Sequence, residues 1–220
     1  MTPVCAASTP ILHDSWQSSA AWRVRAALHL KGIDHDVLKH EIIGKPHRTP
    51  AFMALNPQGT VPVLEIDGQI IPQSLAILEY VEETRPGPHL LPEDAAARAR
   101  VRMLSYIIAM ETHAVTNMDV ARDATRGGEV TDWMHRYLRR GLDAFEAQLD
   151  HPVTGVFCHG DTPGMADCCL VPQVRNAQRA GLELSNWPRI ASIQARCLDH
   201  PAFSETHPDR MVPADFHGGP

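Results

Sequence analysis

Residues 61–77 read Val-Pro-Val-Leu-Glu-Ile-Asp-Gly-Gln-Ile-Ile-Pro-Gln-Ser-Leu-Ala-Ile. Two short apolar segments flank Asp67-Gly68, a pair typical of a tight hairpin turn. Ser74 then begins a helical pattern that continues for about three turns. The stretch therefore predicts two antiparallel strands and a helix, over residues 61–66, 69–71 and 74–83.

The segment before this hairpin alternates strand and helix patterns. An apolar run at 10–13 is followed by a helical stretch over 19–31, which Gly32 closes. A second short strand is expected at 36–40, and a short helix at 50–55. The order βαβ, then helix, then ββα predicts a small mixed sheet faced by helices.

A break in the pattern follows at residues 85–92, where three prolines and one glycine occur within eight residues. Beyond it the apolar spacing is helical. We therefore expect an α/β domain over 1–85, a linker over 86–92 and an all-helical domain over 93–220, with a loosely held tail from Pro208 onward. The expected helices of the second domain span roughly 94–120, 130–149, 165–180 and 188–198.

Composition excludes several classes of protein. The chain has 220 residues, of which 44% are hydrophobic and 21% charged, and its formal net charge is −6. Such a chain can bury a sizeable core, and it has no Lys/Arg-rich run to attract nucleic acid or anionic lipid. No apolar run approaches the roughly 20 residues that span a bilayer, and the first residues do not resemble a signal peptide.

The cysteine and histidine patterns indicate neither disulfides nor a metal site. The five cysteines are odd in number and contain no Cys-x-x-Cys pair, which is typical of reduced thiols and favours a cytoplasmic location. The 13 histidines include no His-Glu-x-x-His motif. Pairs such as His35/His40 and His200/His207 have no neighbouring cysteine or carboxylate ligands in the sequence, so we expect no metal.

Four local features have both a structural and a chemical interpretation. Ser18 or Ser19 can cap the first helix, or can bind an anion such as a thiolate at its N-terminus. The Val61-Pro62 bond can be trans at a strand edge, or cis with the Val61 backbone turned toward a peptide-like ligand. Ser74 can be a plain N-cap or can bind a carboxylate. For Gly164 to Asp167 we favour a structural capping box.

Four motifs in order make the sequence similar to one family. They read Ser-Ser-x-x-Trp-Arg-Val-Arg from residue 18, Ala-Leu-Asn-Pro-Gln-Gly-x-Val-Pro from 54, Gln-Ser-Leu-Ala-Ile-x-Glu-Tyr from 73, and Met-Ala-Asp-x-x-Leu-Val-Pro-Gln-Val from 165. Over residues 10 to about 205 the chain resembles the zeta-class glutathione S-transferases, which include maleylacetoacetate and maleylpyruvate isomerases. The resemblance implies a thioredoxin-like N-terminal domain, an all-helical C-terminal domain, glutathione as cofactor and a homodimer.

The resemblance also implies roles for individual residues. Ser18 corresponds to the serine that faces the glutathione sulfur, with Ser19 beside it, and Arg179 corresponds to an arginine associated with the substrate carboxylate. These three are the expected catalytic residues. The residues expected to bind glutathione are Ser18, His47, Val61, Gln73, Ser74, His113 and Asn117, of which His113 and Asn117 are placed on the long helix after the linker.

Three departures from the family pattern affect the expected reaction. Ala20 stands where the family has a cysteine, so a reaction that needs an enzyme thiol there is excluded. Gln17 replaces an arginine of the maleylpyruvate isomerases, and another arginine near Asp119 is also missing. Gly164 replaces the usual Ser or Thr at a helix N-cap, where glycine is still acceptable.

The resemblance favours glutathione-dependent cis–trans isomerisation of a maleyl-type keto acid in aromatic catabolism. One alternative is a broader transferase that conjugates glutathione to electrophiles or acts on α-halo acids, which Gln17 favours. A second alternative is a binding or assembly module without catalysis. The joint presence of Ser18, His47, Gln73 and Ser74 argues against this second alternative.

Overall fold

The computed structural model describes residues 8–213. They fold into two compact units, which we describe separately. One unit holds the described residues up to Gly87 together with those from Thr206 onward, and the other holds Pro88–Glu205. Cys5 and the last seven residues lie outside the described part of the chain.

The first unit is built on a four-stranded sheet with the strand order β2-β1-β3-β4. The first strand pairs in parallel with the second and antiparallel with the third, so Leu12 lies between Val37 and Leu64. The third and fourth strands form the expected hairpin, and its turn residues Asp67 and Gly68 both have positive φ. The strands are β1 (Ile11–Asp14), β2 (Asp36–Lys39), β3 (Val63–Ile66) and β4 (Gln69–Pro72).

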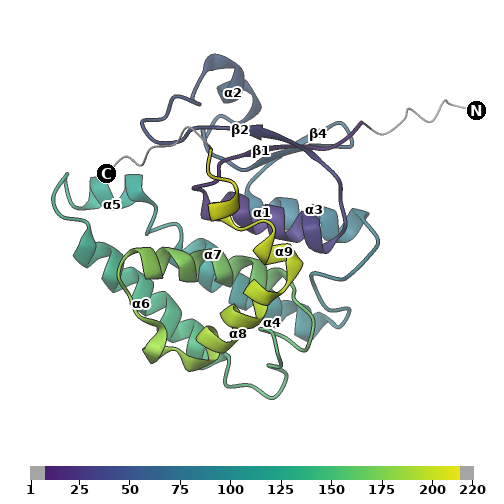
Figure 1. Ribbon diagram of the computed structural model, residues 1–220, viewed down its shortest axis with the longest axis vertical. Helices are drawn as coiled ribbons and strands as arrows, with labels where there is room; N and C mark the ends of the chain where they lie inside the picture. Colours follow the sequence, from purple (N-terminus) through teal and green to yellow (C-terminus); the bar gives the residue numbers. More distant parts are fainter. Residues whose placement is uncertain (1–7, 214–220) are drawn as a thin grey trace, which may run out of the picture. The chain divides into compact units, whose positions relative to one another are not determined.

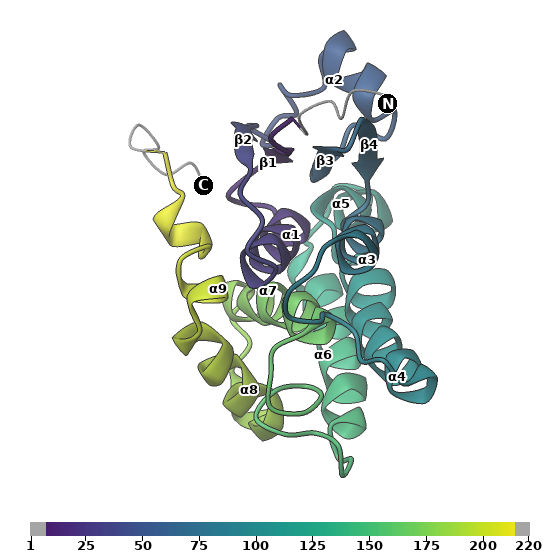
Figure 2. The ribbon, with the colours of Figure 1, turned by 90° about the vertical axis from the view of Figure 1, so that its right-hand side faces the viewer.

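Helices lie on both faces of this sheet. The helices α1 (Ser19–Leu30) and α3 (Ser74–Thr84) lie side by side on one face, and α2 (Pro50–Leu55) lies on the other (Figures 1 and 2). Apolar side chains of the sheet and the two helices form the core between them, including the fully buried Leu12, Leu64, Leu28, Ile77 and Leu78. This is the mixed sheet faced by helices that the residue pattern predicts, and it has the thioredoxin-like arrangement that the resemblance implies.

The segment from Thr206 packs against α1. Trp22 donates its indole N–H to Oγ1 of Thr206 at 3.0 Å, and its ring meets the ring of His207 edge-on at 4.9 Å. The chain then forms a short 3₁₀ helix, η3 (Pro208–Arg210), in which Pro208 is buried. We expected a loose tail from Pro208; its first residue is instead buried directly after two anchored residues, while residues 209–213 are exposed or half-buried.

The second unit is helical, as expected. Buried apolar side chains from several helices form its core, including Leu104, Leu142, Phe145, Leu170 and Val174. The elements are α4 (Ala95–Tyr106), η1 (Ile107–Thr112), α5 (Met118–Ala124), α6 (Thr131–Gln148), α7 (Met165–Arg179), η2 (Leu184–Asn186), α8 (Pro188–Asp199) and α9 (Pro201–Ser204).

The continuous helix expected over 94–120 is not formed. The α-helix ends at Tyr106, six residues of π-helix follow, and a turn leads to α5. In the wide turn the Thr112 hydroxyl donates to the Ile107 carbonyl at 2.7 Å. Gly141 of α6 faces this site, where a Cβ atom would collide with Thr112, so the absent side chain admits the widened turn.

The N-terminus of α7 confirms the capping-box interpretation. The backbone N–H of Gly164 donates to Oδ2 of Asp167 at 2.9 Å. The other carboxylate oxygen accepts from the backbone N–H of Cys158, also at 2.9 Å. Asp167 is almost fully buried, so this carboxylate satisfies donors that would otherwise have no partner.

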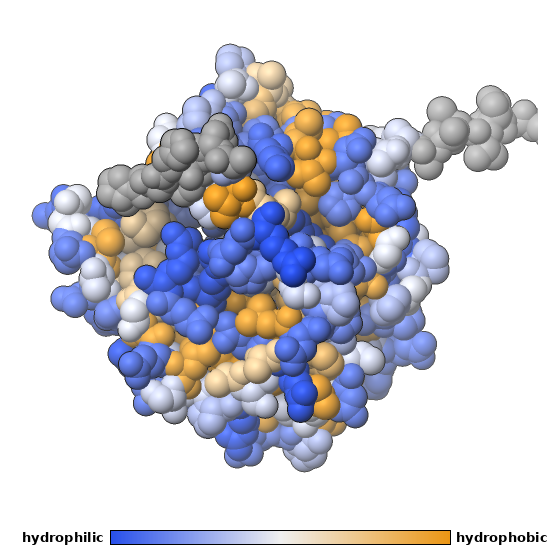
Figure 3. Space-filling model, viewed as in Figure 1, coloured by the Kyte–Doolittle hydropathy of each residue, from blue (hydrophilic) through white to orange (hydrophobic). Residues whose placement is uncertain are grey.

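The exposed surface is mixed in character. On the face seen in Figure 3, hydrophilic residues predominate and apolar residues are interspersed among them. Within residues 8–213, no helix combines the length and the apolar character that crossing a membrane requires.

Candidate active site

Ser18 stands at the N-terminus of α1 and caps it. Its backbone is extended, and its Oγ accepts a hydrogen bond from the N–H of Ala21 at 3.1 Å. This confirms the capping role that the sequence offered for one of the two serines. Because a hydroxyl both accepts and donates, the Ser18 O–H remains able to donate to an anion at this helix end. Ser19 is the first residue of α1 and is buried.

The residues on either side of the serine pair carry neither a basic group nor a thiol. They could neither activate a bound thiol nor act as a thiolate in its place. Residue 20 is Ala20, and residue 17 is a neutral glutamine. Oε1 of Gln17 is buried and has no hydrogen-bond partner among residues 8–213. An anion at this helix end would therefore be stabilised by hydroxyl and backbone N–H groups.

The loop before β3 contains the bond between Val61 and Pro62. The Val61-Pro62 bond is cis, which the sequence left open. Asn56 supports the loop by donating to the Thr60 carbonyl at 2.8 Å. The ring of His47 lies between two carbonyl oxygens, with Nδ1 3.0 Å from Glu41 and Nε2 3.0 Å from Gly59.

Gln73 and Ser74 follow β4, at the N-terminus of α3. Gln73 has φ 73°, in the left-handed region that is costly for a residue with a side chain, and its Nε2 donates to Gln58 at 2.6 Å. Ser74 begins the helix, but it is not the N-cap, so the plain-cap interpretation is wrong. Its hydroxyl instead accepts from Nη1 of Arg23 at 2.7 Å.

Arg23 is a residue that the sequence reasoning did not select. It is 2% exposed, in a helix whose other inward positions are mostly apolar. Its Nε and Nη2 atoms are buried without a hydrogen-bond partner in the described part of the chain. A charged residue within the apolar pattern Ala-Ala-Trp-Arg-Val-Arg-Ala-Ala was the available signal.

These features of the first unit converge through direct contacts. Arg23 joins α1 to Ser74, Gln73 contacts the loop before β3 through Gln58, and His47 contacts the same loop at Gly59. The structure therefore brings His47, the Val61 loop, Gln73 and Ser74 into one linked region of the first unit.

His113, Asn117 and Arg179 belong to the helical unit. His113 and Asn117 are not on a continuous helix, because the helix is interrupted before them. His113 follows the π-helical segment, and its Nδ1 lies 3.3 Å from Oε1 of Gln173 on α7. Asn117 caps α5 by accepting from the N–H of Asp119 at 2.9 Å.

Arg179 is the last residue of α7 and is exposed. No hydrogen bond or ion pair to its guanidinium is found within residues 8–213. It lies about 9 Å further along α7 than Gln173, at about 1.5 Å per residue. Arg179 therefore has no direct link to the group formed by His113 and Gln173.

Two family models match the chain in the order of its units. The model described as "Glutathione S-transferase, N-terminal domain" matches residues 17–84, and the model described as "Glutathione S-transferase, C-terminal domain" matches residues 93–196. The chain belongs to the glutathione S-transferase family.

Several members of the glutathione S-transferase family are similar to this chain over nearly its whole length. A maleylacetoacetate isomerase of Rhizobium meliloti is 49% identical, with 94% of this chain and 100% of that protein covered. A solved zeta-class maleyl pyruvate isomerase has a TM-score of 0.87 and 37% identity, with 93% of this chain and 99% of that chain covered. A solved maleylacetoacetate isomerase of Methylobacterium extorquens, with bound malonate and glutathione, has a TM-score of 0.87 and 36% identity. The match covers 93% of this chain and 100% of that chain.

The described cysteines of this glutathione S-transferase are poor candidates for a nucleophile. Cys158, Cys168, Cys169 and Cys197 are all fully buried. Burial raises the pKa of the Cys158 and Cys197 thiols, and the nearby Asp167 carboxylate adds to this effect. A thiolate for catalysis is therefore not supplied by these side chains.

A histidine cluster, also missed by the sequence reasoning, lies beside the sheet. Nε2 of His13 lies 2.8 Å from Oε1 of Glu65, and Nδ1 of His13 lies 3.0 Å from Nε2 of His40. The rings of His40 and His47 both pack against Phe52 of α2, with centroids 4.8 and 5.5 Å from its ring. The sheet register brings these distant positions together.

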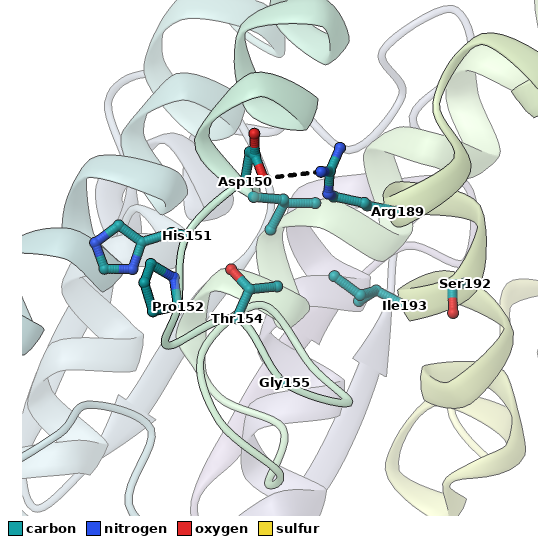
Figure 4. A pocket seen from close by; sticks show the side chains of 9 residues that line it. Asp150, His151, Pro152, Thr154, Gly155, Arg189, Ser192 and Ile193 are labelled. Atoms are coloured by element: carbon teal, nitrogen blue, oxygen red, sulfur yellow. Dashed lines mark hydrogen bonds and ion pairs between the residues drawn. The ribbon is translucent and has the colours of Figure 1, made fainter.

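A separate shallow pocket of about 460 Å³ lies in the helical unit of this glutathione S-transferase (Figure 4). The loop after α6 and the helix α8 form it, and Arg189 reaches across to Asp150 at 2.9 Å. None of its lining residues is an expected site residue. The charged side chains of Arg189 and Asp150 in this pocket pair with each other.

Proposed function

We propose that this chain is a glutathione-dependent cis–trans isomerase of maleyl-type keto acids, converting maleylacetoacetate or maleylpyruvate to the fumaryl form in aromatic catabolism. The similarity of the chain to maleylacetoacetate and maleylpyruvate isomerases supports this assignment. The observation that carries the mechanism is the position of the Ser18 hydroxyl at the N-terminus of the 12-residue helix α1, with Ala20 rather than a thiol beside it.

The chemistry requires a thiolate that adds reversibly. A carbon–carbon double bond does not rotate, but addition of a thiolate to one alkene carbon makes the bond single and moves an electron pair onto the conjugated carbonyl oxygen. Rotation follows, the enolate re-forms the double bond, and the carbon–sulfur bond breaks. Glutathione is released unchanged, and no net proton transfer is needed.

Ser18 is proposed to stabilise this thiolate. A thiol with a pKa of about 8.5 is only a few per cent ionised at pH 7, and a depression of two units needs about 2.7 kcal/mol. A hydrogen bond from the Ser18 hydroxyl to the charged sulfur contributes about 1.5–3 kcal/mol. The helix N-terminus, where Ser19 begins the first turn, adds about 0.3–1 kcal/mol.

The linked region of the first unit is proposed to hold the rest of glutathione. Ser74 and Gln73 would bind the γ-glutamyl end at the N-terminus of α3. The Val61 backbone would pair with the cysteinyl part, as one extended peptide pairs with another. His47 would act through the loop that carries Val61, because its ring nitrogens lie against the Glu41 and Gly59 carbonyls.

The helical unit is proposed to supply the residues for the organic acid. Arg179 would bind a substrate carboxylate or the developing enolate, since its exposed guanidinium has no partner in the described chain. His113 and Asn117 would contribute polar groups for glutathione and the substrate.

A broader transferase activity is the second candidate, and Gln17 favours it. Where the maleylpyruvate isomerases that this chain resembles have an arginine, Gln17 presents a neutral amide that cannot form an ion pair with a second carboxylate. Conjugation of electrophiles, or a reaction on α-halo acids, would use the same thiolate and would need only one carboxylate contact.

We further propose a cytoplasmic homodimer. Met103, Tyr106 and Met110 occur at a spacing of three and four residues along α4 and the π-helical segment, and each is at least one-third exposed. Such a stripe supports an interface with a second copy. In each subunit, residues 1–85 would form the glutathione-binding domain, with the segment from Thr206 packed against it, 86–92 would form the linker, and the residues between them the helical domain.

The test of the function combines binding and turnover. Thermal stabilisation by millimolar glutathione is expected, because a ligand that binds only the folded state raises its stability. Isomerisation of a maleyl keto acid should require glutathione and should fall when Ser18 is replaced by alanine. Glutathione binding without isomerase activity would support the broader transferase, and the absence of both would support a non-catalytic module.

A further inference from the structure

Three cationic side chains are buried in or at the end of α1, and they differ in what they contact. Arg25 pairs with the Asp14 carboxylate, and Lys31 pairs with Glu82 at 2.9 Å. Arg23 contacts the Ser74 hydroxyl, and its remaining donors Nε and Nη2 have no partner in the described part of the chain. A buried cation without a carboxylate is costly, so its charge needs an explanation.

The direction of the Arg23–Ser74 hydrogen bond fixes the role of the hydroxyl. A guanidinium has donors and no acceptor, so Oγ of Ser74 must accept from Nη1 of Arg23. The single O–H proton of Ser74 therefore points to a different acceptor. Ser74 stands at the N-terminus of α3, an 11-residue helix, where free backbone N–H groups also favour an anion.

We propose that Arg23 is a positioning residue, which sets the Ser74 hydroxyl as a donor to the α-carboxylate at the γ-glutamyl end of glutathione and supplies the buried positive charge that this carboxylate offsets. The inference rests on the proposed binding of glutathione. It assigns to Arg23 an effect on one carboxylate of the ligand, not on the thiol.

The test compares two ligands on matched variants. The ligands are glutathione and γ-aminobutyryl-cysteinyl-glycine, which lacks only the α-carboxylate. Wild type should bind glutathione at least about tenfold more tightly than the analogue. This ratio corresponds to the weakest hydrogen bonds that are formed with a charged group. Arg23→Met should lose most of this preference by weakening glutathione binding about 10- to 100-fold, with little effect on the analogue. Arg23→Lys, which keeps a cation that only donates, should restore part of it.

Two further variants separate positioning from general structure. Lys31→Gln breaks a buried ion pair at the other end of α1, so it should lower the melting temperature while leaving the preference for glutathione unchanged. In a Ser74→Ala background, Arg23→Met should have little further effect on the preference, since Arg23 acts through that hydroxyl. The variant Arg23→Met should also raise the KM for glutathione and leave kcat at saturation nearly unchanged.

The outcomes are distinct. A preference that is unchanged in Arg23→Met, or equal weakening of both ligands, would overturn the inference and leave Arg23 with a structural role only. If wild type does not bind glutathione, the proposed function fails and the inference fails with it. If Arg23→Met does not fold, Arg23→Gln, which retains much of the buried volume and removes the charge, is judged by the same comparison.

Discussion

The imidazole rings of His13 and His40 are stacked, with centroids 5.2 Å apart and a hydrogen bond of 3.0 Å between Nδ1 of His13 and Nε2 of His40. Such a bond requires that one of the two facing nitrogens lacks a proton. His47 and Phe52 complete the surroundings of His40, and Glu65 contacts the far side of His13. Protonation of His40 would therefore add charge to a closely packed group.

This arrangement predicts how stability depends on pH. Burial lowers the pKa of His40 below its ordinary value of 6.5, and the neighbouring His13 and His47 lower it further. Between the folded pKa and 6.5 the unfolded chain binds more protons, so stability rises with pH in that window. The stability that depends on neutral His40 is fully present above pH 6.5, and it is lost as the pH falls toward the pKa of His40 in the folded protein.

The prediction is checked by the melting temperature between pH 5 and 7.5. His40→Phe, which retains an aromatic ring without a titrating group, should show a smaller loss of stability on acidification than wild type. His29→Gln removes a histidine outside this cluster and serves as the control. A wild-type pH dependence in His40→Phe would contradict the role given to His40.

Asp167 should be among the most sensitive positions for stability. Asp167→Ala removes the acceptor for two backbone N–H groups, of Gly164 and Cys158, in a buried site. Each unmade buried hydrogen bond costs about 1–3 kcal/mol, so the loss of both should lower the free energy of unfolding by about 2–6 kcal/mol. Urea denaturation measures this loss.

A control for this variant is Asp161→Ala. Asp161 accepts a hydrogen bond from the N–H of Val156 in an exposed loop. Water can replace that contact, so a loss below about 1 kcal/mol is expected. Equal losses in the two variants would show that burial does not set the importance of Asp167.

Local sequence signals predicted the regular elements well. The Asp67-Gly68 turn, the flanking strands and the capped helix α1 follow from neighbouring residues, and the structure has them at nearly the expected bounds. The break at residues 85–92 indicated two domains, whereas the family resemblance, rather than these patterns, supplied the thioredoxin-like fold.

The features that the sequence did not reveal depend on tertiary contacts. The apolar pattern continues through residues 107–112, and the interruption there is accommodated by the absent side chain at Gly141. The partner of Ser74 comes from another helix, so local pattern alone suggested an N-cap. His13 and Glu65 are 52 positions apart and meet through the pairing of β1 with β3.

Substrate choice should depend on Arg179. Arg179→Ala should lower kcat/KM for a maleyl keto acid by about 30- to 1,000-fold, corresponding to about 2–4 kcal/mol for a lost contact with a charged group. Turnover of a neutral electrophile such as a chlorodinitrobenzene should change little, because it has no carboxylate. Equal losses on both substrates would assign Arg179 to the fold or to the glutathione site.

Thiol activation should depend on Ser18. In Ser18→Ala, the pKa of the thiol of bound glutathione should rise, because the hydrogen bond to the charged sulfur is lost. Ultraviolet absorbance of the thiolate measures this pKa. Replacement of Cys158, Cys168, Cys169 or Cys197 by serine or alanine should leave it nearly unchanged. A cysteine variant that remains folded but inactive would contradict the use of glutathione as the thiolate source.

The most direct test of the proposed isomerase is a turnover measurement that follows both the keto acid and the thiol. Wild type is mixed with maleylacetoacetate, in excess over glutathione, and fumarylacetoacetate and free thiol are quantified together. We expect many turnovers per glutathione, an unchanged thiol concentration at the end, and no reaction when S-methylglutathione replaces glutathione. Stoichiometric loss of thiol into a conjugate, or turnover that persists with S-methylglutathione, would contradict the proposed mechanism.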